Sequence, residues 1–242
     1  MTNYKDAMRY KYVIAYDTSS DASKKYIGFD TQEEAEEYIK KSKKNNFYEV
    51  INKPDVKMYF DKDNIKFSNE DFEEYYDKLC SYIPRFMSEE NTDDNKLVRG
   101  SFIFYTKRDE EGFIISIHFI SNEFFTTQEN NKKLCEELNK MDMDFDASVY
   151  SKNRLFSMNG NCKFGKSIKF QYDKLNYNEY ECDKYVSWFN KDDYVEINFM
   201  FKEEIFIEEA YEETKEPVIF NKNDIIDYLK KANNKLWSSS IL

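Results

Sequence analysis

Two aspartates in the stretch VKMYFDKDN are spaced so that they could bind a divalent cation. Asp61 and Asp63 lie two residues apart in a run that alternates apolar and polar side chains. Because successive side chains of a β-strand point to opposite faces, the run places both carboxylates on one face and Val56, Met58 and Phe60 on the other. Neighbouring carboxylates repel each other unless a cation lies between them. Taken alone, the motif also fits ordinary acids at a solvated strand end.

The only histidine of the chain lies in a second alternating run, GFIISIHFIS. Ser116 and His118 share one face of the strand that this run predicts, and apolar side chains alternate with them on the other face. Side by side on a sheet, the two could donate hydrogen bonds to phosphate oxygens or form a hydrolytic pair. A histidine hydrogen-bonded at a sheet surface would give the same pattern.

A basic segment without acids follows a third aspartate, Asp146. The chain holds 47 acids and has a formal net charge of −11, yet residues 147–172 contain no Asp or Glu. The cations of this segment are Lys152, Arg154, Lys163, Lys166 and Lys169. Such a segment in an acidic protein favours the binding of an anion. Together with the two earlier motifs it suggests metal-assisted phosphoryl transfer.

Within this segment, GNCKFGKS at residues 160–167 matches the P-loop pattern G-x-x-x-x-G-K followed by Ser or Thr. A P-loop needs a helix directly after its glycine loop, because the helix N-terminus completes the phosphate cradle. Residues 168–172 instead alternate apolar and polar side chains, which is typical of a strand. We therefore interpret the stretch as a phosphate-holding turn, with a P-loop ATPase as an alternative.

The elements that must position these motifs are a mixture of strands and helices. Strands are predicted at residues 10–16, 100–106, 112–121 and 196–201, extended chain at 48–64, and strand, turn and strand at 149–172. Helices are predicted from the cap pairs Thr31 with Glu34, Ser68 with Asp71 and Thr126 with Glu129, running to about Lys43, Met87 and Met141, and at 224–236. Pro84 should disturb the end of the second helix. The mixture indicates an α+β or α/β class.

Composition places the chain among globular proteins. Its 242 residues are 40% hydrophobic and 18% aromatic, which is enough for a sizeable core. No apolar run is long enough to span a membrane, and no signal peptide is recognised. The four cysteines lack C-x-x-C spacing, and with a single histidine a structural zinc site is not expected. We expect free thiols and a reducing compartment such as the cytoplasm, without secretion.

Taken in order, the three motifs resemble those of the archaeo-eukaryotic primase superfamily, above all its primase-polymerase and large-DNA-virus branch. That family carries an apolar run ending in D-x-D or D-x-E, then S-x-H on a strand, then an Asp before V-Y-x-x-N-R and K-x-G-K. Here these read MYFDKD, SIH and FDASVYSKNR followed by CKFGK, over roughly residues 47–170. Many primase-polymerases have R-x-F-R where this chain reads RLFS, and the zinc-binding tail of some members is missing.

The resemblance implies template-directed nucleotidyl transfer by a DNA primase, a DNA polymerase or a primase-polymerase. Asp61, Asp63 and Asp146 would bind two Mg²⁺ or Mn²⁺ ions and, with His118, form the catalytic set. Contacts to the triphosphate of the incoming nucleotide would come from Ser116, His118, Arg154, Lys163 and Lys166. The implied partners are a single-stranded DNA template, a primer and an NTP or dNTP, with a replicative helicase or a missing fused domain as further candidates and no membrane.

The resemblance also implies an α+β fold in which an RRM-like catalytic sheet packs beside a smaller α/β module. We expect one catalytic unit over residues 1–242. Its N-terminal module would comprise residues 1–50, its motif-bearing core residues 51–175, and its C-terminal strands and helix residues 176–242. Two other classes stay open. A catalytically degenerate member would bind nucleotide or nucleic acid only, and an acidic protein that mimics DNA would bind neither nucleotide nor Mn²⁺.

Overall fold

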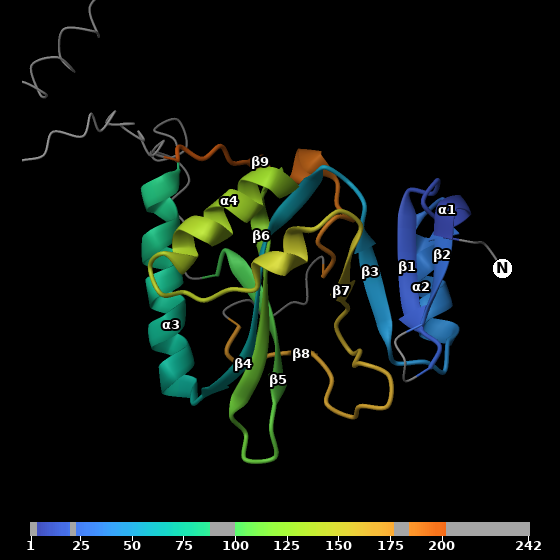
Figure 1. Ribbon diagram of the computed structural model, residues 1–242, viewed down its shortest axis with the longest axis horizontal. Coiled ribbons are helices and arrows are strands. Elements are labelled where there is room, and N and C mark those ends of the chain that lie inside the picture. The colour runs from blue at the N-terminus through green and yellow to red at the C-terminus, as the bar shows by residue number, and fades with distance from the viewer. Residues whose placement is uncertain (1–3, 20–22, 88–99, 177–183, 202–242) are drawn as a thin grey trace, which may run out of the picture. The chain divides into compact units, whose positions relative to one another are not determined.

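The computed structural model of the chain describes residues 4–19, 23–87, 100–176 and 184–201 (Figure 1). The chain divides into two compact units, residues 1–202 and 203–242, and every described residue belongs to the first. The helix expected at residues 224–236 lies outside the described residues. No described helix is long and apolar enough to cross a bilayer.

Sheet A is a four-stranded antiparallel sheet with the strand order β2-β1-β3-β7. Its strands are β1 (Tyr12–Asp17), β2 (Lys24–Phe29), β3 (Phe47–Ile51) and β7 (Arg154–Ser157). The short helix α1 (Tyr4–Ala7) contacts β2, and α2 (Gln32–Lys41) contacts β1 and β2. Residues 1–50 thus supply most of this sheet, and the basic segment supplies its last strand. The predicted capping box of α2 is present, because the Thr31 and Glu34 side chains each accept from the other's backbone N–H.

Sheet B carries the two alternating motifs. Its strands are β4 (Asp55–Phe67), β5 (Phe102–Arg108), β6 (Ile114–Thr127), β8 (Gln171–Tyr172) and β9 (Val195–Glu196). The order is β4-β6-β5-β8, all antiparallel, and β9 pairs in parallel with one end of β6. The α+β class predicted from the sequence is confirmed by this mixture of antiparallel sheets and separate helices.

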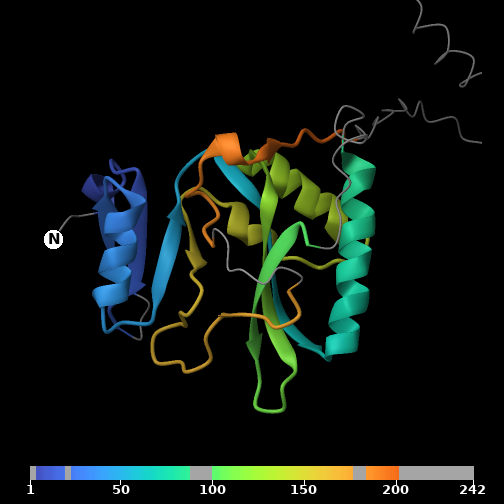
Figure 2. The ribbon, with the colours of Figure 1, turned by 180° about the vertical axis from the view of Figure 1, so that it is seen from behind.

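Helices α3 (Asn69–Tyr82) and α4 (Gln128–Asn139) cover one face of sheet B, and β3 and β7 lie on its other side (Figures 1 and 2). The helix-covered face holds an aromatic core. Phe72 of α3 packs against Phe104 and Phe119, with ring centroids 4.6 and 6.2 Å apart. This core includes Val56, Met58 and Phe60 of the first alternating run and Ile117 and Phe119 of the second, so the polar residues between them point the other way, toward sheet A.

Two predicted helix boundaries need correction. The second helix ends at Tyr82 rather than Met87, because Pro84 is part of a 3₁₀ turn over Ile83–Phe86. The third helix is capped by Thr127, whose side chain accepts from Asn130 N, and not by Thr126. The shift arises because β6 continues to Thr127, six residues beyond the predicted strand end.

The segment at residues 149–172 contains the two predicted strands, but they are short and join different sheets. Residues Ala147–Tyr150 form a 3₁₀ turn, β7 joins sheet A, and β8 joins sheet B. The two strands therefore do not pair with each other. Between them, residues 158–170 form a loop that is closed at its base by Gly160 N donating to Phe170 O at 2.7 Å. No helix directly follows residues 160–167, since the chain continues into β8 at residues 171–172, which agrees with our interpretation against a P-loop.

Candidate functional site

The two predicted motifs lie directly opposite each other on neighbouring strands of sheet B. Asp61 of β4 pairs with His118 of β6, and Asp63 pairs with Ser116. Paired residues of antiparallel strands point to the same face, so all four side chains project toward sheet A. The Ser116 hydroxyl donates to Asp63 Oδ1 at 2.5 Å, and His118 Nε2 lies 3.5 Å from Asp61 Oδ1. The shared faces that alternation predicted are confirmed, and the strand register joins them into one row.

The third aspartate reaches the same place from a separate segment. Asp146 N donates to the Asp61 carbonyl at 2.8 Å, which ties this backbone to β4. The Asp146 side chain caps the following 3₁₀ turn by accepting from Ser148 N at 2.8 Å and from Ser148 Oγ at 2.9 Å. Arg154 Nη2 lies 3.8 Å from Asp146 Oδ2, with both side chains over a third exposed.

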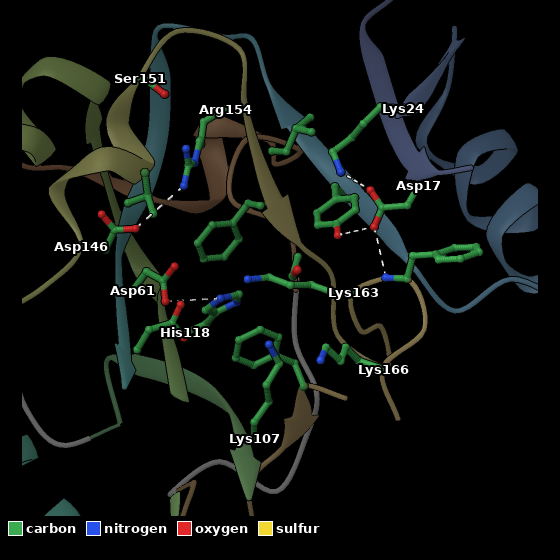
Figure 3. Close-up of a pocket in the computed structure, with 18 of the residues that line it drawn as sticks. Asp17, Lys24, Asp61, Lys107, His118, Asp146, Ser151, Arg154, Lys163 and Lys166 are labelled. Carbon is green, nitrogen blue, oxygen red and sulfur yellow. Dashed lines mark hydrogen bonds and ion pairs between the residues drawn. The ribbon is translucent and has the colours of Figure 1, made fainter. Parts of the chain in front are cut away.

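These residues open onto a cavity of about 740 Å³ between sheet B, β7 and the loop at 158–170 (Figure 3). Seven of the eight predicted site residues line it: Asp61, Asp63, His118, Asp146, Arg154, Lys163 and Lys166. The eighth, Ser116, does not line the cavity, because its buried hydroxyl is directed at Asp63. The cavity has carboxylates on the side of β4 and lysines on the side of the loop (Figure 3).

The carboxyl group of Asp61 is buried, lies near like charges and lacks a hydrogen bond to one of its oxygens. Burial, followed by the charges of Asp63 and Asp146, raises the pKa of Asp61 to about 8. Its Oδ1 atom is buried and accepts no hydrogen bond from any described residue. A buried acceptor among like charges is a position that a bound cation would stabilise.

The same observation tests whether the residues present fit a divalent metal. Among the described residues, no group of three or more Asp, Glu, His or Cys side chains is gathered as a ready-made metal centre. Carboxylate oxygens are nevertheless the ligands that Mg²⁺ and Mn²⁺ prefer. Asp63 and Asp146 both lie near enough to raise the pKa of Asp61. By its donor set and its unsatisfied oxygen, the site therefore fits such ions, although the three side chains would have to close around them.

His118 is an uncharged group held in an aromatic sandwich. Its ring stacks between Phe156 and Phe170, with centroid distances of 4.1 and 3.6 Å. Burial, aided by the charge of Lys107, holds the pKa of His118 well below its usual value, against a hydrogen bond with the Ser157 backbone. The imidazole is therefore neutral at pH 7, and its approach to Asp61 at 3.5 Å is not an ion pair. A neutral ring can donate one N–H to a ligand but adds no positive charge.

The loop holds two of the predicted cations at the ends of a β-turn. Lys166 N donates to Lys163 O at 3.0 Å, and Gly165 between them has a φ of +72°, which glycine adopts without strain. Distant residues fix this turn. Cys162 N donates to Asn45 O at 2.7 Å, and Phe164 N donates to Asp17 Oδ2 at 3.3 Å.

Sequence reasoning missed further residues that line the cavity: Asp17, Lys24, Tyr48 and Lys107. Lys107 of β5 pairs with Ser116, and its Nζ lies 3.9 Å from the centroid of the Phe170 ring. Asp17 of β1 is buried and accepts from Tyr48 Oη at 2.8 Å and from Lys24 Nζ. Lys107 can be assigned to the cavity only once the register of β5 against β6 is known. Asp17 is 147 residues from Phe164 in the sequence, and no local sequence pattern marks it as a residue of the cavity.

No protein-family model matches the chain, and a search of curated proteins found no match to it. The function of the cavity must therefore be inferred from the residues that line it and from their geometry. The three described cysteines, Cys80, Cys135 and Cys162, are thiols rather than halves of a disulfide, as expected.

Proposed function

We propose that the protein is a template-directed nucleotidyltransferase, either a DNA primase or a DNA polymerase that extends primers. The strand register carries this proposal. It sets Asp61 opposite His118 and Asp63 opposite Ser116, at a cavity that Asp146, the arginine and the loop lysines also line. Acids that suit divalent ions and cations that suit phosphates thus share one cavity large enough for a nucleotide.

The order of elements supports the same proposal. β4, α3, β5, β6 and α4 follow one another as strand, helix, strand, strand and helix, and their strands stand in the order β4-β6-β5. This order of elements is compatible with an RRM-like catalytic sheet and supports the proposal. Sheet A with α1 and α2 would be the smaller α/β module beside it.

The acids and the cations would have separate tasks. Asp61, Asp63 and Asp146 would hold two Mg²⁺ or Mn²⁺ ions, which when bound would activate the primer hydroxyl and neutralise phosphate charge. Ser116 would keep the Asp63 carboxylate in its orientation through their hydrogen bond. His118 would lie beside the triphosphate as an uncharged ring.

The cations would bind the triphosphate and stabilise the charge that develops as pyrophosphate leaves. Arg154, Lys163 and Lys166 are the predicted members of this group, and Lys107 joins them from β5. Hydrogen bonds from charged donors to phosphate are about twice as strong as neutral ones. No side chain has to act as a nucleophile, because the primer hydroxyl attacks the α-phosphate.

The loop also offers a place for a single-stranded template. Phe164 and Ile168 are 46% and 41% exposed, and they stand among lysines in the segment without acids. Exposed rings flanked by lysines bind single strands by stacking and charge attraction. In a chain of net charge −11, this is the surface that a polyanion can approach.

A gel assay tests the proposal. The protein is given a single-stranded template, labelled nucleotides and Mn²⁺ or Mg²⁺, with and without an annealed primer. The double variant Asp61→Asn, Asp63→Asn should make no product. The matched control is Asp142→Asn, since Asp142 is exposed and has a φ of +62°, which Asn tolerates. Products only with primer indicate a polymerase, and products without primer indicate a primase. Full activity in the double variant would refute the site.

Two observations favour a second candidate, a module that binds nucleotide without catalysis. No described group of three metal-ligating side chains is already gathered, and Ser157 stands where many primase-polymerases have a second arginine. Such a module would bind labelled nucleotide in a filter assay and yield no product under any condition of the gel assay. A protein that mimics DNA would bind neither nucleotide nor Mn²⁺.

A further inference from the structure

The residue between the two aspartates of β4 is a buried lysine. Lys62 is only 5% exposed, and by alternation it points away from the cavity, toward the face of the sheet that α3 covers. Lysine is almost never this buried unless its ammonium group is paired. The partners of Lys62 therefore indicate what the residue does.

Lys62 binds the segment that leads to the third aspartate. Its Nζ atom donates to the carbonyls of Met143 at 2.8 Å and Asp144 at 3.0 Å, and lies 3.5 Å from Asp144 Oδ2. The Tyr75 hydroxyl of α3 donates to the same Met143 carbonyl at 2.8 Å. Two donors from different elements thus fix one carbonyl, three residues before Asp146.

The backbone of this segment needs such support. Asp142 and Asp144 have φ values of +62° and +51°, which non-glycine residues seldom adopt. On the other side of the segment, Phe145 exchanges two hydrogen bonds with the Asn139 side chain, at 2.7 and 2.9 Å. Asp146 N then donates to the Asp61 carbonyl at 2.8 Å. The segment is therefore tied to β4 twice, by the backbone carbonyl of Asp61 and by the side chain of Lys62.

We propose that Lys62 is a positioning residue that sets where the Asp146 carboxylate stands relative to Asp61 and Asp63. The inference deepens the proposed function and rests on it. Residues 61 and 63 supply two ligands on one face of the strand, and residue 62 uses the other face to hold the segment that supplies the third. The three carboxylates can then close around the metal ions from a fixed starting arrangement, although Asp146 lies outside the sheet.

Removing the ammonium group should weaken metal binding more than nucleotide binding. Lys62→Met keeps the apolar stem and deletes the donor, so the segment loses its charged anchor. Loss of a residue that orients a metal ligand typically lowers metal affinity about 10–100-fold. Arg154 and Lys163 do not contact Lys62, so the KM for nucleotide at saturating Mn²⁺ should change less than about threefold.

The test measures Mn²⁺ affinity without nucleotide, from the electron paramagnetic resonance signal of free Mn²⁺. The matched control is Lys66→Met, because Lys66 lies on the same strand but is exposed and pairs with Glu111. Tyr75→Phe removes the weaker donor to the Met143 carbonyl while keeping the ring in the core. We expect a 10–100-fold loss in Lys62→Met, a smaller loss in Tyr75→Phe and no change in Lys66→Met. Excess Mn²⁺ should restore synthesis in Lys62→Met and not in Asp61→Asn, Asp63→Asn.

The outcomes separate this inference from the function on which it rests. A folded Lys62→Met variant with wild-type Mn²⁺ affinity overturns the inference and leaves the proposed function standing. If the wild type binds no Mn²⁺ and makes no product, both the inference about Lys62 and the proposed function are refuted. If Lys62→Met does not fold, as judged by circular dichroism, Tyr75→Phe decides, and an unchanged Mn²⁺ affinity in it contradicts the inference.

Discussion

The two walls of the cavity are built in different ways. The acidic wall is the surface of sheet B, where the register of β4 against β6 sets Asp61 and Asp63 opposite His118 and Ser116, together with Asp146, whose backbone is tied to β4. The basic wall is an irregular loop, whose lysines are exposed and whose turn is fixed by Asp17 of β1 and by Asn45, which precedes β3. One wall is part of the core, and the other is attached to it by a few hydrogen bonds.

Because the two walls are built differently, they should respond differently to amino-acid substitutions. A carboxylate of the acidic wall is one of only three proposed to hold the metal ions, so its loss should remove a function outright. A lysine of the loop has several neighbours of the same charge, so its loss should weaken binding by degrees. The following predictions test the contrast.

The largest effect is expected for Asp146→Asn. Asparagine can still cap the 3₁₀ turn, so the free energy of unfolding should change by less than about 1 kcal/mol. Primer extension should nevertheless fall at least about 100-fold, because one of three metal-binding carboxylates loses its charge. Extension rates and thermal unfolding measure the two quantities. Activity within a few fold of wild type would show that the acidic wall does not include Asp146.

A second prediction concerns the pH dependence of stability, measured with urea in metal-free buffer. The pKa of Asp61 is about 8 in the folded protein and near 3.8 when unfolded. Between these values the folded state keeps a proton that the unfolded state has lost, so this group's contribution to stability falls as pH rises. Relative to Asp61→Asn, the wild type should lose up to about 1.4 kcal/mol per pH unit in this window. Parallel stability curves for the two proteins would contradict the burial of a carboxyl at this position.

Loss of one loop cation should have a graded effect. Lys163→Met should raise the KM for nucleotide about tenfold or more, since a hydrogen bond to a charged group contributes roughly 1.5–3 kcal/mol. Mn²⁺ affinity without nucleotide should stay unchanged, because Lys163 belongs to the other wall. Steady-state kinetics and Mn²⁺ titration provide the comparison, with Lys152→Met as a control from the same segment that does not line the cavity. A parallel fall in Mn²⁺ affinity would mean that the walls are not independent.

The smallest effect is expected where the loop is attached. Burial raises the pKa of Asp17, but hydrogen bonds from Lys24, Tyr48 and the Phe164 backbone outweigh it and leave the pKa lowered, so the carboxylate is charged at pH 7. Asp17→Asn weakens this attachment without removing a lysine from the loop. We expect the KM for nucleotide to rise about two- to fivefold with little change in kcat. A loss of kcat without a change in KM would place Asp17 in the chemistry instead.

The same contrast explains what the sequence could predict. Alternation revealed the faces of β4 and β6, and their polar residues proved to be one row, because strand periodicity is a local property. Alternation did not predict β2, because every residue of KKYIGF is partly exposed and apolar and polar side chains do not alternate along it. Nor could alternation show that β7 and β8 join different sheets. That outcome depends on hydrogen bonds made by the loop between them, from Gly160 to Phe170 and from Cys162 to Asn45.

The central claim is that the cavity adds nucleotides under the direction of a template, and single-nucleotide extension tests it most directly. Four primed templates that differ only in the next template base are each offered the four labelled nucleotides one at a time, with Mn²⁺. We predict that the wild type and Asp142→Asn add only the complementary nucleotide in each case, and that Asp61→Asn, Asp63→Asn adds none. Addition that ignores the template base, or an Asp61→Asn, Asp63→Asn variant as active as wild type, would contradict the claim.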